Sequence, residues 1–434
     1  MRILIISQIF LPEMGALSNR LYPFVRSFAD AGHKVTVATG MPNYPAGKVF
    51  PEYRGRLFST ENADGCTIIR TAYLTTPRNL SKLRQLLSYL SFIPAVFLSG
   101  MRAGPADVVL VTSPPPFPIL PAILIAAIRR AKLVMDVRDL WSDELVTYGG
   151  MKESGIAVWL VRRLERWGYR WASLITPTTQ SLIDTVVERG AERTKMFLVP
   201  NGADLVLFKP MPPDNPTARE YPFRDRFVLM YSGLFGIKHG LEVLLEAARI
   251  LRDNKKIVFF LLGDGARRKA LEKYIETENL ENVIIAGGRA VKDVPAIIAR
   301  ADVCFAAVSP EVYSKKLISV KLFEYLACEK PVIGAVAGES ARVLEESGGG
   351  VVVPPGDADG IVNAILDLYN DPNKCEAMGK AGRRYVEEKF SRRDWAARLE
   401  LRIATFGVGS PPGAEATMDG EVPSSSPSPV QGFR

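Results

Sequence analysis

The stretch SVKLFEYLACEKPVIG, residues Ser319–Gly334, joins a helix pattern directly to a strand pattern. Lys321 and Glu324 are three residues apart, so a helix places both on one face while leucines and tyrosine pack on the other. The step from Lys330 to Pro331 ends the helix, because the residue before a proline disfavours the helical conformation. The apolar run that follows predicts a buried strand, and such helix-to-strand units build α/β folds.

Similar units recur along the chain, where short β-branched runs alternate with amphipathic segments such as Arg20–Ala31 and Ile156–Trp171. The strands predicted before a break at Val199–Asp204 are Ile3–Ser7, Lys34–Thr39, Thr67–Thr71, Val108–Thr112, Lys132–Asp136 and Leu174–Thr178. Those predicted after a proline-containing loop are Phe227–Tyr231, Val258–Leu262, Val283–Ala286, Val303–Ala306 and Pro331–Ile333. The pattern therefore predicts an α/β protein with two tandem Rossmann-like domains and mostly parallel sheets.

Composition agrees with two domains and excludes several classes of function. The chain has 434 residues, of which 47% are hydrophobic and 24% charged, enough for two ordinary cores. Four scattered cysteines and two histidines argue against a disulfide framework, a metal site and Ser-His-Asp catalysis. No nucleic-acid-binding motif is present. From about residue 407 to 434 the sequence is rich in Gly, Pro and Ser, which predicts a disordered tail.

The positive charge is concentrated in the first half of the chain. Residues 1–200 hold 24 Lys and Arg against 15 Asp and Glu, whereas the remainder holds 31 against 32. This excess favours an anionic partner, a membrane surface or a lipid phosphate, over nucleic acid, although a basic charge can also serve solubility alone. The uncharged stretches 85–101 and 108–128 have basic flanks and suit either contact with one membrane leaflet or two core helices. The second should form a strand, a loop and a helix from about Pro118.

The first residues do not resemble a signal peptide. The apolar run Ile3–Ile6 is short, is soon followed by Glu13, and lacks a convincing cleavage site. We therefore expect a cytoplasmic protein.

Two glycine-containing loops follow predicted strands, where open α/β sheets bind ligands. Gly15 precedes a helix after the first strand, and Gly233–Gly240, with Lys238, follows the first strand of the second half. Neither loop has the spacing of a P-loop or of a dinucleotide-binding motif. Alone, each loop is weak evidence for a ligand site, because many turns between a strand and a helix contain glycine for packing reasons.

In combination, these motifs resemble those of a known family. Ser319–Gly334, Gly233–Gly240, Leu262–Gly265 and Val199–Asp204 are together similar to motifs of the retaining glycosyltransferases of family 4. The resemblance runs from Met1 to about Phe406. Three N-terminal motifs are most similar to the branch that makes O-antigen and capsule and includes L-fucosamine transferases: Ala31–Val37, Pro42–Pro45 and Asp136–Trp141.

The resemblance implies the GT-B architecture, two Rossmann-like domains that face a central cleft. Residues 1–200 would form the acceptor-side domain, joined by a returning helix at about 386–406. Residues 201–385 would form the domain that binds the nucleotide-sugar donor.

The resemblance also implies roles for residues of the donor site. Glu324 would bind the ribose hydroxyls, and Lys238 with the backbone of Gly236 would hold the diphosphate. Gly15 and Ala16 would approach the diphosphate from the opposite domain.

Three further positions relate to variable parts of the family pattern. Arg289 falls near the nucleobase contact, and Lys321 matches a branch with a Ser-x-Lys motif before the retained Glu. The first acid of the family's pattern is replaced by Lys316. A histidine found in many relatives has no counterpart, and Asp139 is the substitute candidate, with helix capping or pairing to Arg138 as its structural alternatives.

The activity implied is retaining transfer of a sugar, with an N-acetylated amino sugar as one candidate. The donor would be a UDP-sugar and the acceptor a polyprenyl-diphosphate-linked saccharide at the inner face of the cell membrane. A cationic, amide-lined cradle can stabilise the leaving diphosphate without a metal or cofactor. Two other readings stay open: an enzyme like the UDP-N-acetylglucosamine 2-epimerases, and a non-catalytic scaffold.

Overall fold

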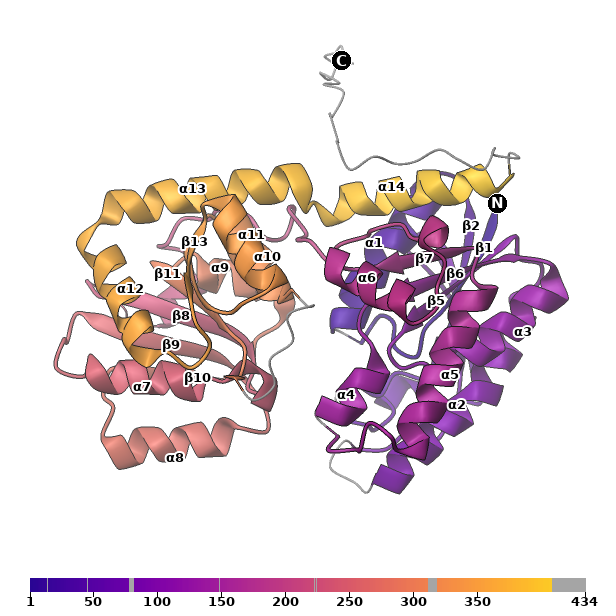
Figure 1. Ribbon diagram of the computed structural model, residues 1–434, viewed down its shortest axis with the longest axis horizontal. Helices are drawn as coiled ribbons and strands as arrows, with labels where there is room; N and C mark the ends of the chain where they lie inside the picture. The colour runs from indigo at the N-terminus through magenta and orange to yellow at the C-terminus, as the bar shows by residue number, and fades with distance from the viewer. Residues whose placement is uncertain are drawn as a thin grey trace, which may run out of the picture.

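The computed structural model describes residues 1–407 except 14, 45, 78–81, 148, 222, 224 and 311–317. The proposed tail and Lys316 therefore lie outside the described residues. Two α/β domains stand side by side, and two helices follow one another along one edge of the molecule, one over each domain (Figure 1). The two Rossmann-like halves predicted from the alternating pattern are confirmed.

The first domain has a seven-stranded sheet in the order β3-β4-β2-β1-β5-β6-β7. Its strands are β1 (Arg2–Ile6), β2 (Lys34–Gly40), β3 (Phe58–Ala63), β4 (Cys66–Thr71), β5 (Val108–Ser113), β6 (Lys132–Val137) and β7 (Leu174–Pro177). All neighbours are parallel except β3 and β4. Its helices are α1 (Ala16–Asp30), α2 (Lys82–Arg102), α3 (Ile119–Arg129), α4 (Trp141–Thr147), α5 (Ile156–Trp171) and α6 (Gln180–Glu188).

The second domain has a fully parallel six-stranded sheet in the order β10-β9-β8-β11-β12-β13. Its strands are β8 (Phe227–Leu234), β9 (Ile257–Asp264), β10 (Val283–Ala286), β11 (Val303–Ala307), β12 (Val332–Ala335) and β13 (Gly350–Val353). Its helices are α7 (Glu242–Ile250), α8 (Arg268–Glu278), α9 (Val294–Ile298), α10 (Val320–Ala327), α11 (Glu339–Ser347), α12 (Ala358–Asn370) and α13 (Pro372–Lys389).

Every predicted strand overlaps an observed one, but β3 and β13 were missed. The side chains of β3 are all at least partly exposed at the sheet edge, so its sequence lacks the apolar run that marks a buried strand. The short β13 begins with a glycine and follows two others, which resembles a turn. The helix expected from about Pro118 is α3, which begins at Ile119.

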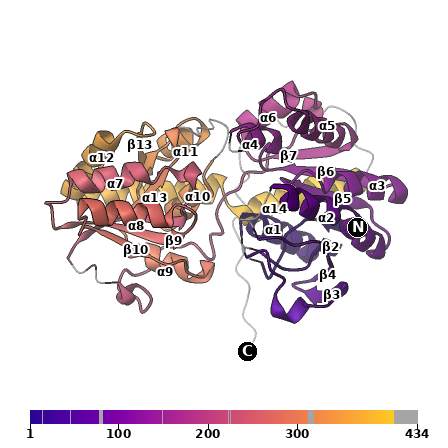
Figure 2. The same ribbon diagram turned by 90° about the horizontal axis from the view of Figure 1, so that it is seen from below.

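Helices cover both faces of the first sheet. On one face α1 packs with α14 (Arg392–Ala404), where Ala396, Leu399 and Ile403 join the core around β1. On the other face α2, α3, α5 and α6 cover the sheet, as Figure 2 shows from below. No helix among the described residues is long and apolar enough to cross a membrane.

The chain crosses between the domains twice, and the two crossing segments pair with each other. The amide of Ala203 donates to the carbonyl of Phe390 at 2.9 Å, and the amide of Arg392 donates back to Ala203 at 2.9 Å. Gly202, at φ +57°, lies against this pair, and a Cβ there would be 2.2 Å from the carbonyl oxygen of Phe390. This close approach explains why the motif at the break contains a glycine.

A buried ion pair anchors the first crossing. Arg20 on α1 lies 2.6 Å from Asp136 on β6, and their side chains are 4% and 0% exposed. The same guanidinium donates to the carbonyls of Val199 and Pro200 at 2.9 and 3.3 Å. The hydroxyls of two threonines, Thr112 on β5 and Thr176 on β7, donate to Asp136 at 3.0 Å. The network therefore ties three strands and α1 to the point where the chain leaves the domain.

We expect Arg20→Ala to destabilise the first domain by about 3–5 kcal/mol, because it leaves the Asp136 carboxylate buried without its cation. Thermal unfolding followed by calorimetry measures the effect. Arg2→Ala, which removes an exposed ion pair to Asp107, serves as the control and should change the unfolding temperature little. Equal unfolding temperatures for the two variants would contradict the role given to the buried pair.

Candidate functional site

Lys238 comes from the second domain but is held by the first. Strand β8 ends at Leu234, and a single turn, Ile237–His239, begins after Gly236, whose backbone is extended. Gly240 ends that turn in the left-handed conformation. The ammonium of Lys238 lies 2.5 Å from a carboxylate oxygen of Glu144 on α4. The two domains therefore meet through an ion pair at the carboxyl ends of their sheets.

Asp139 lies beside this ion pair, in the loop that joins β6 to α4. Its carboxylate accepts the amide hydrogen of Leu140 at 2.7 Å. Burial, reinforced by the negative charge of Glu144, raises the pKa of Asp139 to about 7, whereas Lys238 partly offsets the shift. Asp139, Glu144 and Lys238 thus form a cluster of two carboxyl groups and one ammonium between the domains, which we call the interdomain cluster.

Glu324 and Lys321 project from α10 toward a second charged centre. Arg392, at the start of α14, lies 3.9 Å from the Glu324 carboxylate. Burial raises the pKa of Glu324 to about 6, although Arg392 and Lys321 both act to lower it. Arg392 also donates to the carbonyls of Asn201 and Gly202, so Glu324 faces the hinge between the domains.

Lys321 is buried over an aromatic ring. Its ammonium lies 3.8 Å from the centroid of Tyr231, and a Cβ at Gly233 would lie 3.2 Å from the same nitrogen. No hydrogen-bond acceptor contacts this nitrogen in the described part of the chain. Burial therefore lowers the pKa of Lys321 to about 7. A buried ammonium without an acceptor is costly, and an anion bound beside it would restore the missing hydrogen bonds.

His239 connects the two groups of charges. Burial and the positive charges of Lys321 and Lys238 lower its pKa to about 3, so its ring is neutral at physiological pH. Because the charges of both lysines lower the pKa of His239, both ammonium groups lie near its ring. The structure thus brings together Lys238, Lys321, Glu324 and Asp139 near the domain boundary.

Gly15 and Ala16 stand at the first-domain side, at the beginning of α1. Buried Glu13 accepts the amides of Asn43 and Tyr44 at 2.8 Å each, which fastens the loop after β2 to the loop after β1. A Cβ at Gly15 would be 3.2 Å from the Tyr44 ring, so the two loops leave little space for a side chain there.

Arg289 stands apart from these residues. It lies in the loop after β10, at the edge of the second sheet, where it pairs with Glu220 and bonds the hydroxyl of Tyr221 at 3.2 Å. Its guanidinium is exposed, and these contacts hold it in the second domain.

Sequence reasoning missed Glu144 and Arg392. Glu144 is three residues beyond the Asp136–Trp141 motif, on the first turn of α4, and only the domain arrangement reveals that it meets Lys238. Arg392 follows Glu324 by 68 residues in sequence, so no local pattern links them. The one signal that the sequence offers for Arg392 is that a charged residue stands in the expected returning helix.

An aromatic cluster adjoins α4 on the first-domain side. The rings of Tyr89 on α2, Phe117 and Trp141 have centroids 5.2–5.6 Å apart. Trp141 begins the helix that carries Glu144, so an apolar surface borders the interdomain cluster.

Two family models match the chain, one for each domain. The "Glycosyl transferase 4-like domain" matches residues 15–202, and "Glycosyl transferases group 1" matches residues 217–385. The chain belongs to the GT-B glycosyltransferases of family 4, as its motifs indicated.

Curated relatives carry similar descriptions. "Putative colanic acid biosynthesis glycosyl transferase WcaI" of Escherichia coli K12 is 26% identical over 355 residues, which cover 80% of this chain and 85% of the relative. "Probable glycosyltransferase WbjE" of Pseudomonas aeruginosa is 23% identical, over 69% of this chain and 75% of its own.

Solved structures share the fold. Sucrose-phosphate synthase from Thermosynechococcus elongatus superposes with a TM-score of 0.72 at 20% identity, covering 94% of this chain and all of that one. Anabaena HepE in complex with UDP gives 0.69 at 17% identity, covering 93% of this chain and all of its own. At these identities the likeness concerns the fold alone.

The raised pKa of Asp139 predicts that this residue lowers the free energy of unfolding by an amount that depends on pH. Between about pH 4 and 7 the unfolded chain ionises this carboxyl while the folded protein keeps it protonated, so the contribution of Asp139 to stability falls as pH rises. We therefore expect the unfolding temperature of Asp139→Asn to rise relative to that of the wild type across this range. Calorimetry at several pH values measures the difference.

Glu144→Gln is the matched comparison, because it removes the neighbouring negative charge and should shrink the same pH dependence. A difference between Asp139→Asn and the wild type that stays constant from pH 4 to 8 would contradict the elevated pKa.

Proposed function

We propose that this protein is a retaining glycosyltransferase that moves a sugar from a UDP-sugar to a lipid-linked saccharide during surface polysaccharide assembly. The observation that carries the proposal is the convergence of Lys238, buried Lys321 and Glu324 beside a carboxyl pair from the opposite domain.

The donor diphosphate would bind between Lys238 and the first-domain loop at Gly15 and Ala16, with the backbone of Gly236 as a further contact. Cleavage of the bond from the anomeric carbon leaves negative charge on the diphosphate, and a fixed ammonium stabilises that charge in the transition state. Lys321, which lacks an acceptor, would supply a second positive charge. The UDP complex of HepE, which shares this fold, agrees with a uridine nucleotide as donor.

Glu324 would bind the ribose hydroxyls. A carboxylate accepts hydrogen bonds from both hydroxyls of a diol, and Arg392 beside it favours the charged form. Arg289 would contact the nucleobase from the loop after β10, provided the base extends to that edge of the sheet.

The acceptor would enter from the first domain. Asp139, whose pKa is near 7, can hold or release a proton at the acceptor side of the site. In the retaining route the acceptor hydroxyl attacks on the face from which the diphosphate leaves, and a phosphate oxygen takes its proton. No protein nucleophile is needed in that route, and closure of the domains would exclude water.

Surface polysaccharide assembly is supported by the descriptions of the relatives, which name colanic acid for WcaI and an O-antigen chain for a mannosyltransferase of Escherichia coli. A saccharide on a polyprenyl diphosphate fits the basic first half of the chain. Such an acceptor would place the enzyme in the cytoplasm, peripherally at the inner face of the membrane.

UDP should raise the unfolding temperature of the wild type, because a ligand of the folded state adds stability. The gain is about 2.7 kcal/mol at a UDP concentration one hundred times Kd. Glu324→Ala should lose most of this shift, whereas Glu276→Ala, which removes an exposed glutamate of α8, should keep it. Thermal shift with UDP, GDP and phosphate measures selectivity. Absence of any nucleotide shift in the wild type would overturn the donor assignment and favour the scaffold reading.

Glu144 competes with the diphosphate for Lys238, so its removal should strengthen UDP binding. An ion pair of this partly exposed kind is worth about 0.2–1 kcal/mol. We therefore expect Glu144→Gln to lower the Kd of UDP by a factor of roughly 1.5 to 5. Titration calorimetry on Glu144→Gln and wild type measures the ratio. An unchanged or larger Kd would show that Lys238 does not exchange Glu144 for the ligand.

A further inference from the structure

Three helices form one outer surface of the first domain. Helix α3 packs between α2 and α5, and all three cover the same face of the sheet (Figures 1 and 2). Helices α3 and α5 approach so closely at Gly168 that a Cβ there would lie 3.0 Å from a methyl group of Ile119. We call the solvent side of α2, α3 and α5 the three-helix face.

This face exposes an unusual amount of apolar surface. Twenty large hydrophobic side chains are exposed in the described part of the chain, and twelve of them lie on these helices. They are Leu83, Leu86, Leu87, Leu90, Leu98, Leu124, Ile128, Ile156, Trp159, Leu160, Trp167 and Trp171. An apolar area that is gathered on one surface marks an interaction site.

The charged side chains that α2, α3 and α5 themselves expose all have one sign, and the carboxylate of Glu153, in the loop before α5, pairs with Arg162. The sequences of α2 and α3 contain no Asp or Glu, and the single acid of α5, Glu165, is buried and bonded to Ser142. The arginines that are exposed or partly exposed along these helices are Arg84, Arg102, Arg129, Arg162, Arg163, Arg166 and Arg170. An apolar surface whose own helices expose an excess of cations is complementary to anionic lipid headgroups over acyl chains.

Helix α5 has the clearest division between the two kinds of residue. Arg163, Arg166 and Arg170 are spaced by three, four and seven residues, so they share one edge of the exposed side. Ile156, Leu160, Trp167 and Trp171 share the other edge, with spacings of four, seven and four. The apolar edge is the one nearer to α3, which packs on α5 at Gly168 and itself exposes Leu124 and Ile128. Tryptophan favours the boundary between headgroups and acyl chains.

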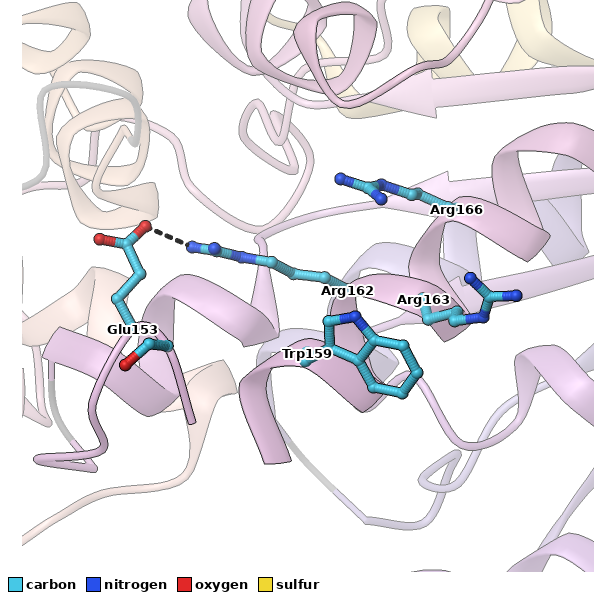
Figure 3. A pocket seen from close by; sticks show the side chains of 6 residues that line it. Glu153, Trp159, Arg162, Arg163 and Arg166 are labelled. Carbon is cyan, nitrogen blue, oxygen red and sulfur yellow. Dashed lines mark hydrogen bonds and ion pairs between the residues drawn. The ribbon is translucent and has the colours of Figure 1, made fainter. Parts of the chain in front are cut away.

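A hollow of about 180 Å³ lies on the cationic edge of α5, lined by Glu153, Ser154, Trp159, Arg162, Arg163 and Arg166. Figure 3 shows Arg162 reaching Glu153, with which it pairs at 2.8 Å, and Arg166 extending in the same direction. Arg163 points the other way, with its guanidinium 5.5 Å from the centre of the Trp159 ring. Because Glu153 already pairs with Arg162, the cations of this edge that suit a lipid phosphate are Arg163, beside the aromatic ring, and Arg166.

We propose that the three-helix face docks on an anionic membrane, with Trp159, Trp167 and Trp171 in the boundary layer and Arg163, Arg166 and Arg170 on lipid phosphates. This inference deepens the proposed function, because a lipid-linked acceptor is reached at a membrane surface. It also names α5, which the charge-free stretches of the sequence did not indicate.

The three-helix face is connected to the interdomain cluster through α4. Glu165 of α5 accepts from the hydroxyl of Ser142 at 2.8 Å, and Arg162 lies 3.9 Å from Asp143. Glu144, the next residue of α4, holds Lys238. A lipid headgroup at α5 would therefore lie on the opposite side of one short helix from the candidate site.

The test is flotation of the full chain with vesicles of phosphatidylcholine alone or with one quarter phosphatidylglycerol. We expect binding to the anionic vesicles only. Each arginine near such a surface contributes about a fivefold factor, so Arg163→Gln/Arg166→Gln/Arg170→Gln should lower partitioning on the order of a hundredfold. Trp159→Ala/Trp167→Ala/Trp171→Ala should lower it by at least about tenfold.

Matched variants of the second domain control for general loss of charge and of apolar surface. Arg252→Gln/Lys256→Gln/Lys269→Gln removes three exposed cations there, and Ile250→Ala removes an exposed apolar side chain. Both should bind anionic vesicles like the wild type. Thermal shift with UDP on every variant checks that the fold and the donor site are intact.

The proposal is overturned if the wild type does not bind anionic vesicles, if both face variants bind as well as the wild type, or if it binds the two vesicle types equally. It is also overturned if light scattering shows a wild-type dimer that the tryptophan variant converts to a monomer, without vesicle binding. Vesicle binding without a rise of the unfolding temperature in UDP would support docking by the three-helix face but contradict the proposed donor site. Failure of the docking proposal can therefore be distinguished from failure of the proposed function.

Discussion

The buried pair of Arg20 and Asp136 fixes where the chain leaves the first domain, and the site depends on that point. The guanidinium holds the carbonyls of Val199 and Pro200, and the next residues pair with the returning segment at Phe390. A displaced crossing would move Arg392 away from Glu324 and Lys238 away from Glu144. Separating the two side chains would leave a buried charge without its partner, which strongly destabilises the fold. The anchor therefore resists small rearrangements.

Each of the two domains contributes a different set of charged groups to the candidate site. The second domain supplies cations and a carboxylate from rigid elements, namely the turn after β8 and helix α10. The first domain supplies Asp139 and Glu144 from the loop after β6 and from α4. Glu144 pairs with Lys238 in this structure, so under the proposed function an arriving diphosphate would replace one anionic partner with another. Such an exchange would cost less than desolvating a free ammonium, and it would link donor binding to the contact between the domains.

Local sequence was sufficient for most of the fold because alternating apolar runs and amphipathic helices are short-range patterns. It failed at β3, whose exposed edge position needs no apolar run, and at β13, whose glycines resemble a turn. The motif around Lys321 and Glu324 was found from helical spacing, and Lys238 from its place after a strand. Glu144 and Arg392 were not found, since their significance comes from residues of the other domain. On the three-helix face, the low charge of α2 and α3 was visible in the sequence, but the exposure of the α5 tryptophans was not.

The sequence by itself determined the two α/β domains, the class of enzyme, the basic first half and the residue types available for a donor site. Only the tertiary structure decided that Asp139 and Lys238 meet through Glu144, that Lys321 is buried over Tyr231 without an acceptor, and that Arg289 stands at the sheet edge. The physical reason is that spacing along a strand or helix fixes which side chains share a face. The dielectric surroundings and partners of a charge depend on segments far apart in the chain, and these set its pKa and its cost of burial.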